Sequence, residues 1–277
     1  MNFQFNKFFF LFILLISTNT QTSAQTIDSI KAQTIAVVSS PIPIPIPNGL
    51  LRLKAAYPDF IERVDLNTVY FKDGKSMLYN DGEVDKSLDT MLYRPDIEDM
   101  MKFSYPVGLW YGTPLESDEA GRYRYEPFFQ KMYGATKAAV ERNLTTIIWL
   151  PGIADTKLRV SKVNGIAEKL QLISNELATL PTEFQKYLKH EGGTFNWRTV
   201  SGSTRRSLHS FGIALDINPQ YADYWDWTKD KNGNFTYHNQ VPMEIVLIFE
   251  KYGFIWGGKW LHHDTMHFEY RPELIGL

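Results

Sequence analysis

The chain has 277 residues, of which 44% are hydrophobic and 14% aromatic, which is ample for one well-buried domain. A formal net charge of -2 argues against nucleic acid or an anionic membrane as the main partner. Because there is no cysteine, disulfides and acylation at cysteine are excluded, and a soft-metal site would have to use histidine and carboxylate ligands.

Residues 1–24 predict a secretory signal peptide. Lys7 precedes the unbroken apolar run Phe8–Ile16, and a polar stretch then ends in small residues before Gln25. This is the order of a charged region, an apolar region and a cleavage site. The apolar run is far shorter than the roughly 20 residues of a membrane-spanning helix. We therefore expect export to the periplasm or the medium, without a stable membrane anchor after cleavage.

Residues 25–48 predict a linker. Their first part is rich in Ser, Thr, Gln and Ala without a clear period, and residues 41–47 alternate proline with isoleucine. Alternating proline favours an extended, polyproline-like rod, which is typical of a spacer. We expect a single domain over residues 49–277.

Several segments of this domain have the period of a helix or a strand. Two short runs around Asp73-Gly74, within residues 68–79, predict a hairpin. Helical spacing of apolar residues predicts helices over 127–140, 163–177, 182–190 and 243–250. Short apolar or alternating runs predict strands at 146–150, 194–198 and 266–270. Helices that precede and interrupt a group of strands indicate an α+β fold.

Two stretches near the C-terminus carry candidate metal ligands. His209 and Asp216 lie in the first stretch, separated by small residues that would let the backbone bend so that both side chains converge. His267 lies in the second stretch and shares one face of its predicted strand with Glu269, because side chains alternate along a strand. Two histidines and one carboxylate, with a fourth position left to water, form the ligand set of a catalytic zinc site. The sequence therefore predicts one bound Zn²⁺ ion.

Asp264, three residues before His267, is the candidate catalytic base. Zinc with three protein ligands lowers the pKa of its water from about 15.7 to about 7. Asp264 would take the proton of that water as it attacks an amide carbonyl, and would deliver it to the leaving amine. This role requires that Asp264 is not itself a ligand. The prediction is a zinc hydrolase.

Other side chains near the motifs have more than one interpretation. Ser207 could fix the first motif by a hydrogen bond to nearby backbone. Trp256 and Trp260 flank two glycines before the second motif, where they either wall the substrate cleft or pack over the core. The loop after Asp216 is expected to cap the cleft. The remaining neighbours are interpreted as flanking residues or structural ion pairs: His262, His263, Arg122 and Arg124.

The two motifs, SxHxxGxAxD and a downstream DxxHFE, together resemble the VanY-type D-Ala-D-Ala carboxypeptidase family. This family is grouped with lysostaphin-like peptidases and the hedgehog signalling domain. Aspartate in DxxH makes the chain most similar to the branch of phage endolysins and L-Ala-D-Glu peptidases. The resemblance is strong over about residues 190–272 and fainter over 118–150.

The resemblance implies a small antiparallel sheet with helices packed on it and a peptidoglycan stem peptide as substrate. It assigns the zinc ligands to His209, Asp216 and His267, and the catalytic base to Asp264. An arginine before the first motif binds a substrate carboxylate in this family. Arg198 is the first choice for that role, and Arg206 or Arg205 the next.

Two alternatives stay open at this stage. One is a D-Ala-D-Ala carboxypeptidase or dipeptidase in place of an endopeptidase. The other is a non-catalytic binding module that keeps the fold and the metal, as in the hedgehog domain. Oligomeric state leaves no signature in the sequence.

Overall fold

The computed structural model describes residues 45–276, so the predicted signal peptide and all but the end of the predicted linker lie outside the described residues. Helix α1 (Asn48–Ala56) buries Leu50 and Leu53. Three short antiparallel strands follow in the order β1 (Ile61–Val64), β2 (Thr68–Phe71) and β3 (Ser76–Leu78). The predicted hairpin is confirmed as β2 and β3, and Gly74 in its turn has a φ of +80°.

Two short helices lead away from this sheet, α2 (Leu88–Tyr93) and α3 (Ile97–Met101). Asp96 and Asp99 form a capping box at the start of α3, which satisfies two backbone N–H groups reciprocally. The buried ammonium of Lys86 donates to both carboxylates, at 3.1 and 2.8 Å. The loop before α2 is thereby fixed to the start of α3.

The single helix predicted over 127–140 is wrong, because the chain forms two helices there. Helix α4 (Glu126–Tyr133) ends before Gly134, whose φ is +123°. A Cβ at Gly134 would come within 2.9 Å of the Val140 backbone nitrogen, so the bend requires glycine. Thr136 then accepts from the Ala139 N–H and begins α5 (Lys137–Glu141).

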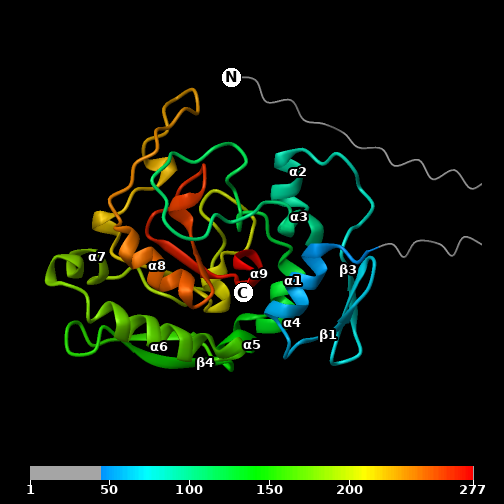
Figure 1. The fold of residues 1–277 in the computed structure, drawn as a ribbon, viewed down its shortest axis with the longest axis horizontal. Coiled ribbons are helices and arrows are strands. Elements are labelled where there is room, and N and C mark those ends of the chain that lie inside the picture. The colour runs from blue at the N-terminus through cyan, green and yellow to red at the C-terminus, as the bar shows by residue number, and fades with distance from the viewer. Residues whose placement is uncertain (1–44, 277) are drawn as a thin grey trace, which may run out of the picture. The chain divides into compact units, whose positions relative to one another are not determined.

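A second hairpin pairs β4 (Leu144–Trp149) with β5 (Thr156–Ser161). The strand predicted at 146–150 is confirmed as β4, whereas β5 was not predicted. Helix α6 (Ile166–Leu177) lies along β4 (Figure 1), and its Gln171 and Ser174 hydrogen bond to the backbone of Ile148 in β4. The helix predicted over 182–190 is reduced to a 3-10 turn and the short α7 (Gln185–Leu188).

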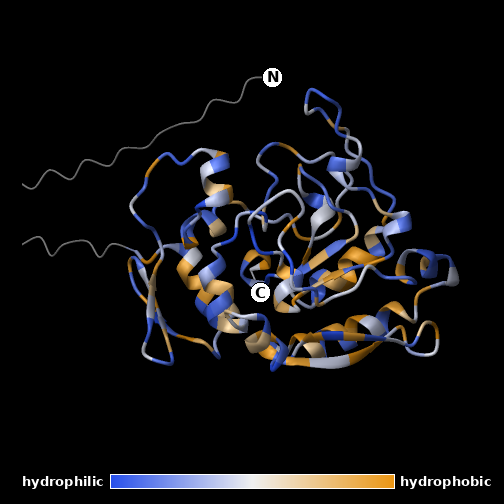
Figure 2. Cartoon of the chain, turned by 180° about the vertical axis from the view of Figure 1, so that it is seen from behind, coloured by the Kyte–Doolittle hydropathy of each residue, from blue (hydrophilic) through white to orange (hydrophobic). Residues whose placement is uncertain are grey.

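The central sheet is antiparallel with the strand order β6 (Ala214–Asp216), β8 (His267–Tyr270) and β7 (Phe254–Trp256). Helix α8 (Met243–Lys251) covers it, and the Phe249 ring stacks on the Phe268 ring at 3.8 Å between centroids. Helix α9 (Pro272–Ile275) ends the described chain. In Figure 2 the hydrophobic colour concentrates on the central strands and the helices beside them. The predicted α+β class, with helices packed on a small antiparallel sheet, is confirmed.

The strand predicted at 194–198 is wrong. Its neighbourhood makes only isolated bridges, from Gly193 to Asp216 and from Thr199 to Arg206. The Asn196 N–H donates instead to the His209 carbonyl, so this segment pairs with the loop that carries the first motif. The remaining 3-10 turns of the described chain are Val163–Gly165, Leu208–Phe211, Pro219–Tyr221, Trp225–Trp227 and Gly257–Lys259. None of the helices within residues 45–276 has the length and apolarity that crossing a membrane requires.

Candidate metal centre and its pocket

The first motif turns sharply between its two candidate ligands. His209 lies in a 3-10 turn that ends at Gly212, and Asp216 ends strand β6. Gly212 has a φ of +67°, and a Cβ there would meet Leu144 Cδ2 at 2.6 Å and the Ser161 backbone nitrogen at 3.1 Å. Only glycine fits this position, and the turn it permits directs His209 back toward the end of β6.

Replacing Gly212 with Ala will lower the free energy of unfolding by about 1–3 kcal/mol, because the side chain meets both backbone strain and a steric clash. Gly233 is the matched control, since its φ is +87° but a methyl group placed on its Cα would have no neighbour within 4 Å. Urea unfolding of the two variants separates the cost of backbone strain, which both share, from the cost of the steric clash, which only Gly212→Ala has. Equal losses at both positions would show that the close approach to Leu144 is unimportant.

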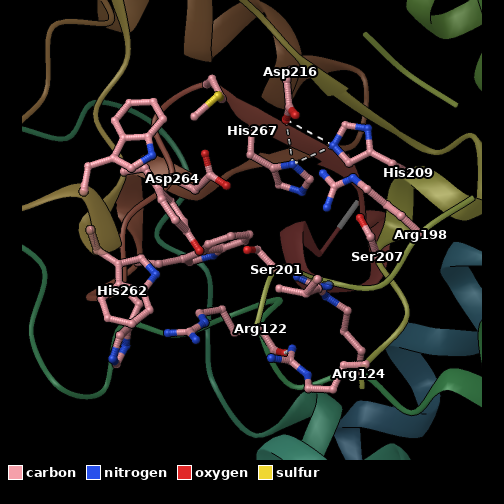
Figure 3. A pocket seen from close by; sticks show the side chains of 17 residues that line it. Arg122, Arg124, Arg198, Ser201, Ser207, His209, Asp216, His262, Asp264 and His267 are labelled. Carbon is pink, nitrogen blue, oxygen red and sulfur yellow. Dashed lines mark hydrogen bonds and ion pairs between the residues drawn. The ribbon is translucent and has the colours of Figure 1, made fainter. Parts of the chain in front are cut away.

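The register of the central sheet brings the second motif to the same point. Asp216 and His267 are directly paired between β6 and β8. His209 Nε2 lies 3.1 Å from Asp216 Oδ1 and 3.2 Å from His267 Nδ1, and the last two atoms are 3.0 Å apart (Figure 3). The three predicted ligands therefore form one group, with both histidines buried and Asp216 partly buried, that can hold a metal ion.

The far nitrogen of each imidazole has its own acceptor. His209 Nδ1 lies 2.6 Å from the Thr194 carbonyl oxygen, and His267 Nε2 lies 3.0 Å from Glu269 Oε2. A proton on each of these nitrogens leaves the lone pair of the other nitrogen facing the centre of the group. Such outer partners fix the tautomer and orientation of metal-binding histidines. The arrangement therefore fits a divalent cation.

Glu269 is fully buried between cations. Its carboxylate lies 3.1 Å from Arg271 and 3.6 Å from Arg124, in addition to His267. Burial raises its pKa, but Arg124, His267 and Arg271 outweigh burial and lower the pKa to about 2. Sequence reasoning placed Glu269 on the face of His267 and gave it no role, because its cationic partners lie in other segments.

The carboxylates around His267 keep its imidazole protonated when no metal is bound. Burial lowers the pKa of His267, but its hydrogen bonds to Asp216 and Glu269 raise the pKa to about 10. Burial also opposes ionisation of Asp216, yet the two histidines keep the pKa of this carboxyl far below its ordinary value. A cation that binds here must displace the proton of His267.

Asp264 is held beside the ligands by its backbone. Its N–H donates to the Gly257 carbonyl at 3.0 Å, and it forms a bridge with Tyr224. A Cβ on Gly257 would lie 2.6 Å from the Asp264 carbonyl oxygen, so a larger residue would displace this loop. Figure 3 shows the Asp264 carboxylate facing the same space as His267.

The Asp264 carboxyl has the properties of a proton acceptor. Its Oδ1 is buried without a hydrogen-bond partner within the described residues. Burial is the largest cause that raises its pKa to about 6, and Asp216 adds to this, while His267, His209 and Arg198 oppose it. A buried acceptor left unpaired is costly unless a ligand or water completes it.

A cavity of about 310 Å³ opens onto the metal group and Asp264. Among the predicted substrate contacts, Arg198, Ser207 and Trp260 line it. Trp256 does not, because it is fully buried and donates to the Thr265 carbonyl, so its core interpretation is the one observed. Arg206 lies over the Trp197 ring and lines a different hollow.

The cavity is also lined by side chains of the loop after Asp216, by His262 and by arginines. Tyr224, Trp225 and Trp227 line it, as expected for a loop that caps the cleft. His262 lines it as well, whereas it was interpreted as a flanking residue. The arginines expected to be structural, Arg122 and Arg124, do form ion pairs with Glu119 and Glu269, but they also line the cavity, together with Arg205.

The α+β domain therefore combines a His-Asp-His group that could hold a metal ion, a neighbouring carboxyl and a cavity of about 310 Å³ that both of them line. A family model described as D-alanyl-D-alanine carboxypeptidase matches residues 201–270, which include His209, Asp216, Asp264 and His267. The resemblance of this chain to the VanY-type family is confirmed by this match, which supports a peptidase of the D-Ala-D-Ala carboxypeptidase type. No curated protein and no solved structure matches the chain.

Proposed function

We propose that this protein is an exported zinc peptidase that hydrolyses a peptide bond in peptidoglycan stem peptides. The observation that carries the proposal is the convergence of three ligand atoms within 3.2 Å of one another, beside a buried carboxyl oxygen that lacks a partner. The family match over the same residues favours a wall peptide as substrate.

His209, Asp216 and His267 would hold the ion through Nε2, a carboxylate oxygen and Nδ1. When bound, zinc supplies a Lewis acid for the peptide carbonyl and lowers the pKa of water. Histidine and carboxylate are suitable donors for zinc, and the chain has no thiolate to offer.

Asp264 carries the proton through the reaction. As a carboxylate it accepts a proton from the attacking water. As a carboxylic acid it then donates that proton to the leaving amine nitrogen. Burial favours the protonated form of Asp264 and raises its pKa to about 6 in the absence of a bound cation, which brings it closer to the range that general acid–base catalysis uses.

Glu269 supports His267 in this scheme as a positioning residue. Replacing Glu269 with Gln will weaken zinc binding by about 10–100-fold, because the Nε2 proton of His267 loses its charged acceptor. Glu250→Gln is the matched control, since Glu250 is equally buried and paired with Lys259 but does not touch a ligand. Competition with a chromogenic chelator measures both affinities. Unchanged affinity in Glu269→Gln would remove this role.

A carboxypeptidase acting on a terminal D-Ala-D-Ala is the second candidate function. Arg198 lines the cavity, and none of the carboxylates in residues 45–276 lies within ion-pair distance of it, so it is available for a substrate carboxylate. Arg198 and His209 line the same cavity (Figure 3). If Arg198→Ala destroyed activity on peptides ending in D-Ala-D-Ala, this candidate would gain over endopeptidase action.

The decisive experiment is digestion of purified peptidoglycan by residues 25–277, with mass spectrometry of the products and Asp264→Ala as control. New fragments seen only with the parent protein are expected, and their masses identify the bond. Bound zinc with no fragments from either protein would favour a peptide substrate outside the wall or the non-catalytic binding module. Export is tested separately by the N-terminal sequence and location of the mature chain, which we expect to begin at Gln25.

A further inference from the structure

A hollow of about 600 Å³ adjoins the cavity that contains the metal group. It is lined by Leu88 and Tyr93 of α2 and by Tyr224 and Trp225 of the loop after β6, and we call it the outer hollow. The side chains that line both spaces include Arg122, Ser201, Tyr224, Trp225 and His262. Because the two spaces share these walls, a ligand held at the metal group can extend into the outer hollow.

The charged side chains of the outer hollow largely neutralise one another. Glu119 pairs with Arg122 at 3.0 Å, and Asp226 pairs with Lys229 at 2.6 Å. The other charged side chains that line the hollow are two acidic and one basic, Asp89, Glu116 and Arg205. The lining as a whole therefore has little net charge, and it suits a neutral polar ligand better than an anion or a cation.

An open aromatic ring and several hydroxyl groups complete the lining. Tyr93 is 49% exposed, so much of its side chain is open to solvent. Ser201 and Ser203 add hydroxyl groups to the same hollow. The pyranose ring of a sugar packs its C–H groups on such an aromatic face, while its hydroxyl and acetamido groups hydrogen bond to polar side chains nearby. The lining therefore has both kinds of contact that a neutral sugar uses.

We propose that the outer hollow binds a sugar of the wall glycan to which the stem peptide is attached. Stem peptides carry free carboxylates or amines, whereas the N-acetylated sugars of the glycan are neutral, so the balanced charge of the hollow favours the sugar. Peptide and glycan are covalently joined, so a peptide in the metal cavity brings its sugar to the adjacent space. The inference rests on the proposed peptidase function and makes the preferred substrate a sugar-bearing peptide.

Two substrates that differ only in the sugar test the proposal. One is a stem pentapeptide joined through its N-terminal amide to the N-acetylated disaccharide of the glycan, and the other is the same peptide with an N-acetyl group. Both have a neutral amide at the N-terminus, so the charge of the peptide is unchanged. With the zinc-loaded parent, the sugar is expected to raise kcat/KM by about tenfold, chiefly by lowering KM, because it lies away from the reacting atoms.

Tyr93→Ala should reduce the advantage of the sugar to less than about threefold, while the N-acetyl peptide is cut at the parent rate. Tyr93 lines the outer hollow but not the metal cavity, so its loss leaves the peptide contacts in place. Tyr111→Ala is the matched control, because Tyr111 is 83% exposed and lines neither space, and it should keep the full advantage. Leu88→Ala, an exposed residue of the same helix, is an independent second variant if Tyr93→Ala does not fold.

The outcomes separate this proposal from the proposed function. If the parent cuts both substrates equally, the peptidase function stands and the inference is wrong. An advantage that persists unchanged in both α2 variants would mean that the sugar binds elsewhere. If the parent cuts neither substrate, the peptidase function fails, and calorimetric titration of both substrates into zinc-loaded Asp264→Asn decides the inference by itself. Tighter binding of the sugar-bearing peptide is then expected, and equal binding overturns the proposal.

Discussion

Replacing Asp264 with Asn will lower kcat by about 10²–10⁴-fold, the range attributed to a general acid–base residue. The amide keeps the size of the side chain but accepts no proton at the attacking water. Because Asp264 is not among the ligand atoms of the metal group, bound zinc should remain at one ion per chain. Steady-state kinetics and elemental analysis of the same sample measure both quantities.

The matched control for Asp264 is Asp59→Asn, an exposed aspartate far along the chain from both motifs, which should keep the parent rate. Retention of the parent kcat in Asp264→Asn would require another proton acceptor, and His262, which lines the cavity and contacts Glu119, is a candidate. If Asp264→Asn behaved like the parent in every functional assay, the result would instead support the non-catalytic binding module.

The pH profile provides a second test of Asp264. Its pKa is raised to about 6, chiefly by burial, and the base acts in its ionised form. Activity must therefore fall as pH decreases toward the pKa, and a bound cation nearby shifts that fall to lower pH. We expect an acidic limb in kcat/KM at or below about pH 6. The residual activity of Asp264→Asn should lack this limb.

Removing zinc will abolish activity, and adding it back at pH 7 will release about one proton per ion. His267 has a pKa of about 10 in the metal-free chain and therefore carries a proton at pH 7, which the metal must displace. Zinc affinity should consequently fall by about tenfold for each unit of decreasing pH. Calorimetry in two buffers of different ionisation enthalpy measures the proton release. Full activity after exhaustive chelation, with no metal by elemental analysis, would refute the mechanism.

The same proton has a defined effect on stability. A folded-state pKa of His267 above its unfolded value contributes stability that is complete below about pH 6.5 and is lost as pH rises toward about 10. The metal-free domain should therefore become less stable across that interval. Free zinc at 100 times its dissociation constant should add about 2.7 kcal/mol. Thermal unfolding with and without zinc at several pH values tests both expectations.

Local sequence patterns were sufficient to predict which residues form the metal group. His209, Asp216 and His267 lie within short motifs whose glycine and alternating strand pattern have direct structural meaning, and the structure brings them together. The α+β class was predictable for the same reason, since α6 and α8 have clear helical periods. Gly134 interrupts one such period, because a positive φ ends a helix that its apolar spacing alone would continue.

Contacts between distant segments were not predictable from the sequence. Arg205 and Arg206 are adjacent in sequence, but only the former lines the cavity, and which of two consecutive side chains faces a site depends on the local bend. Arg124 meets Glu269 across 145 residues, and no short-range pattern signals that pair. Residues 194–198 have the composition of a strand, yet their backbone partner is a loop, which composition does not show.

The direct pairing of Asp216 with His267 has a consequence for how this domain tolerates change in chain length. The 50 residues between these two ligands begin and end on neighbouring strands, so their length does not set the distance between the ligands. An insertion in the exposed stretch around residues 229–240 would leave the metal group intact. A single-residue insertion inside β6, ahead of Asp216, would instead turn the Asp216 side chain to the opposite face of the sheet and separate it from the two histidines. Exchange of residues 229–240 therefore changes Phe235 and Tyr237, the aromatic side chains that pack against Trp225 and His263, while the spacing of the ligands stays the same.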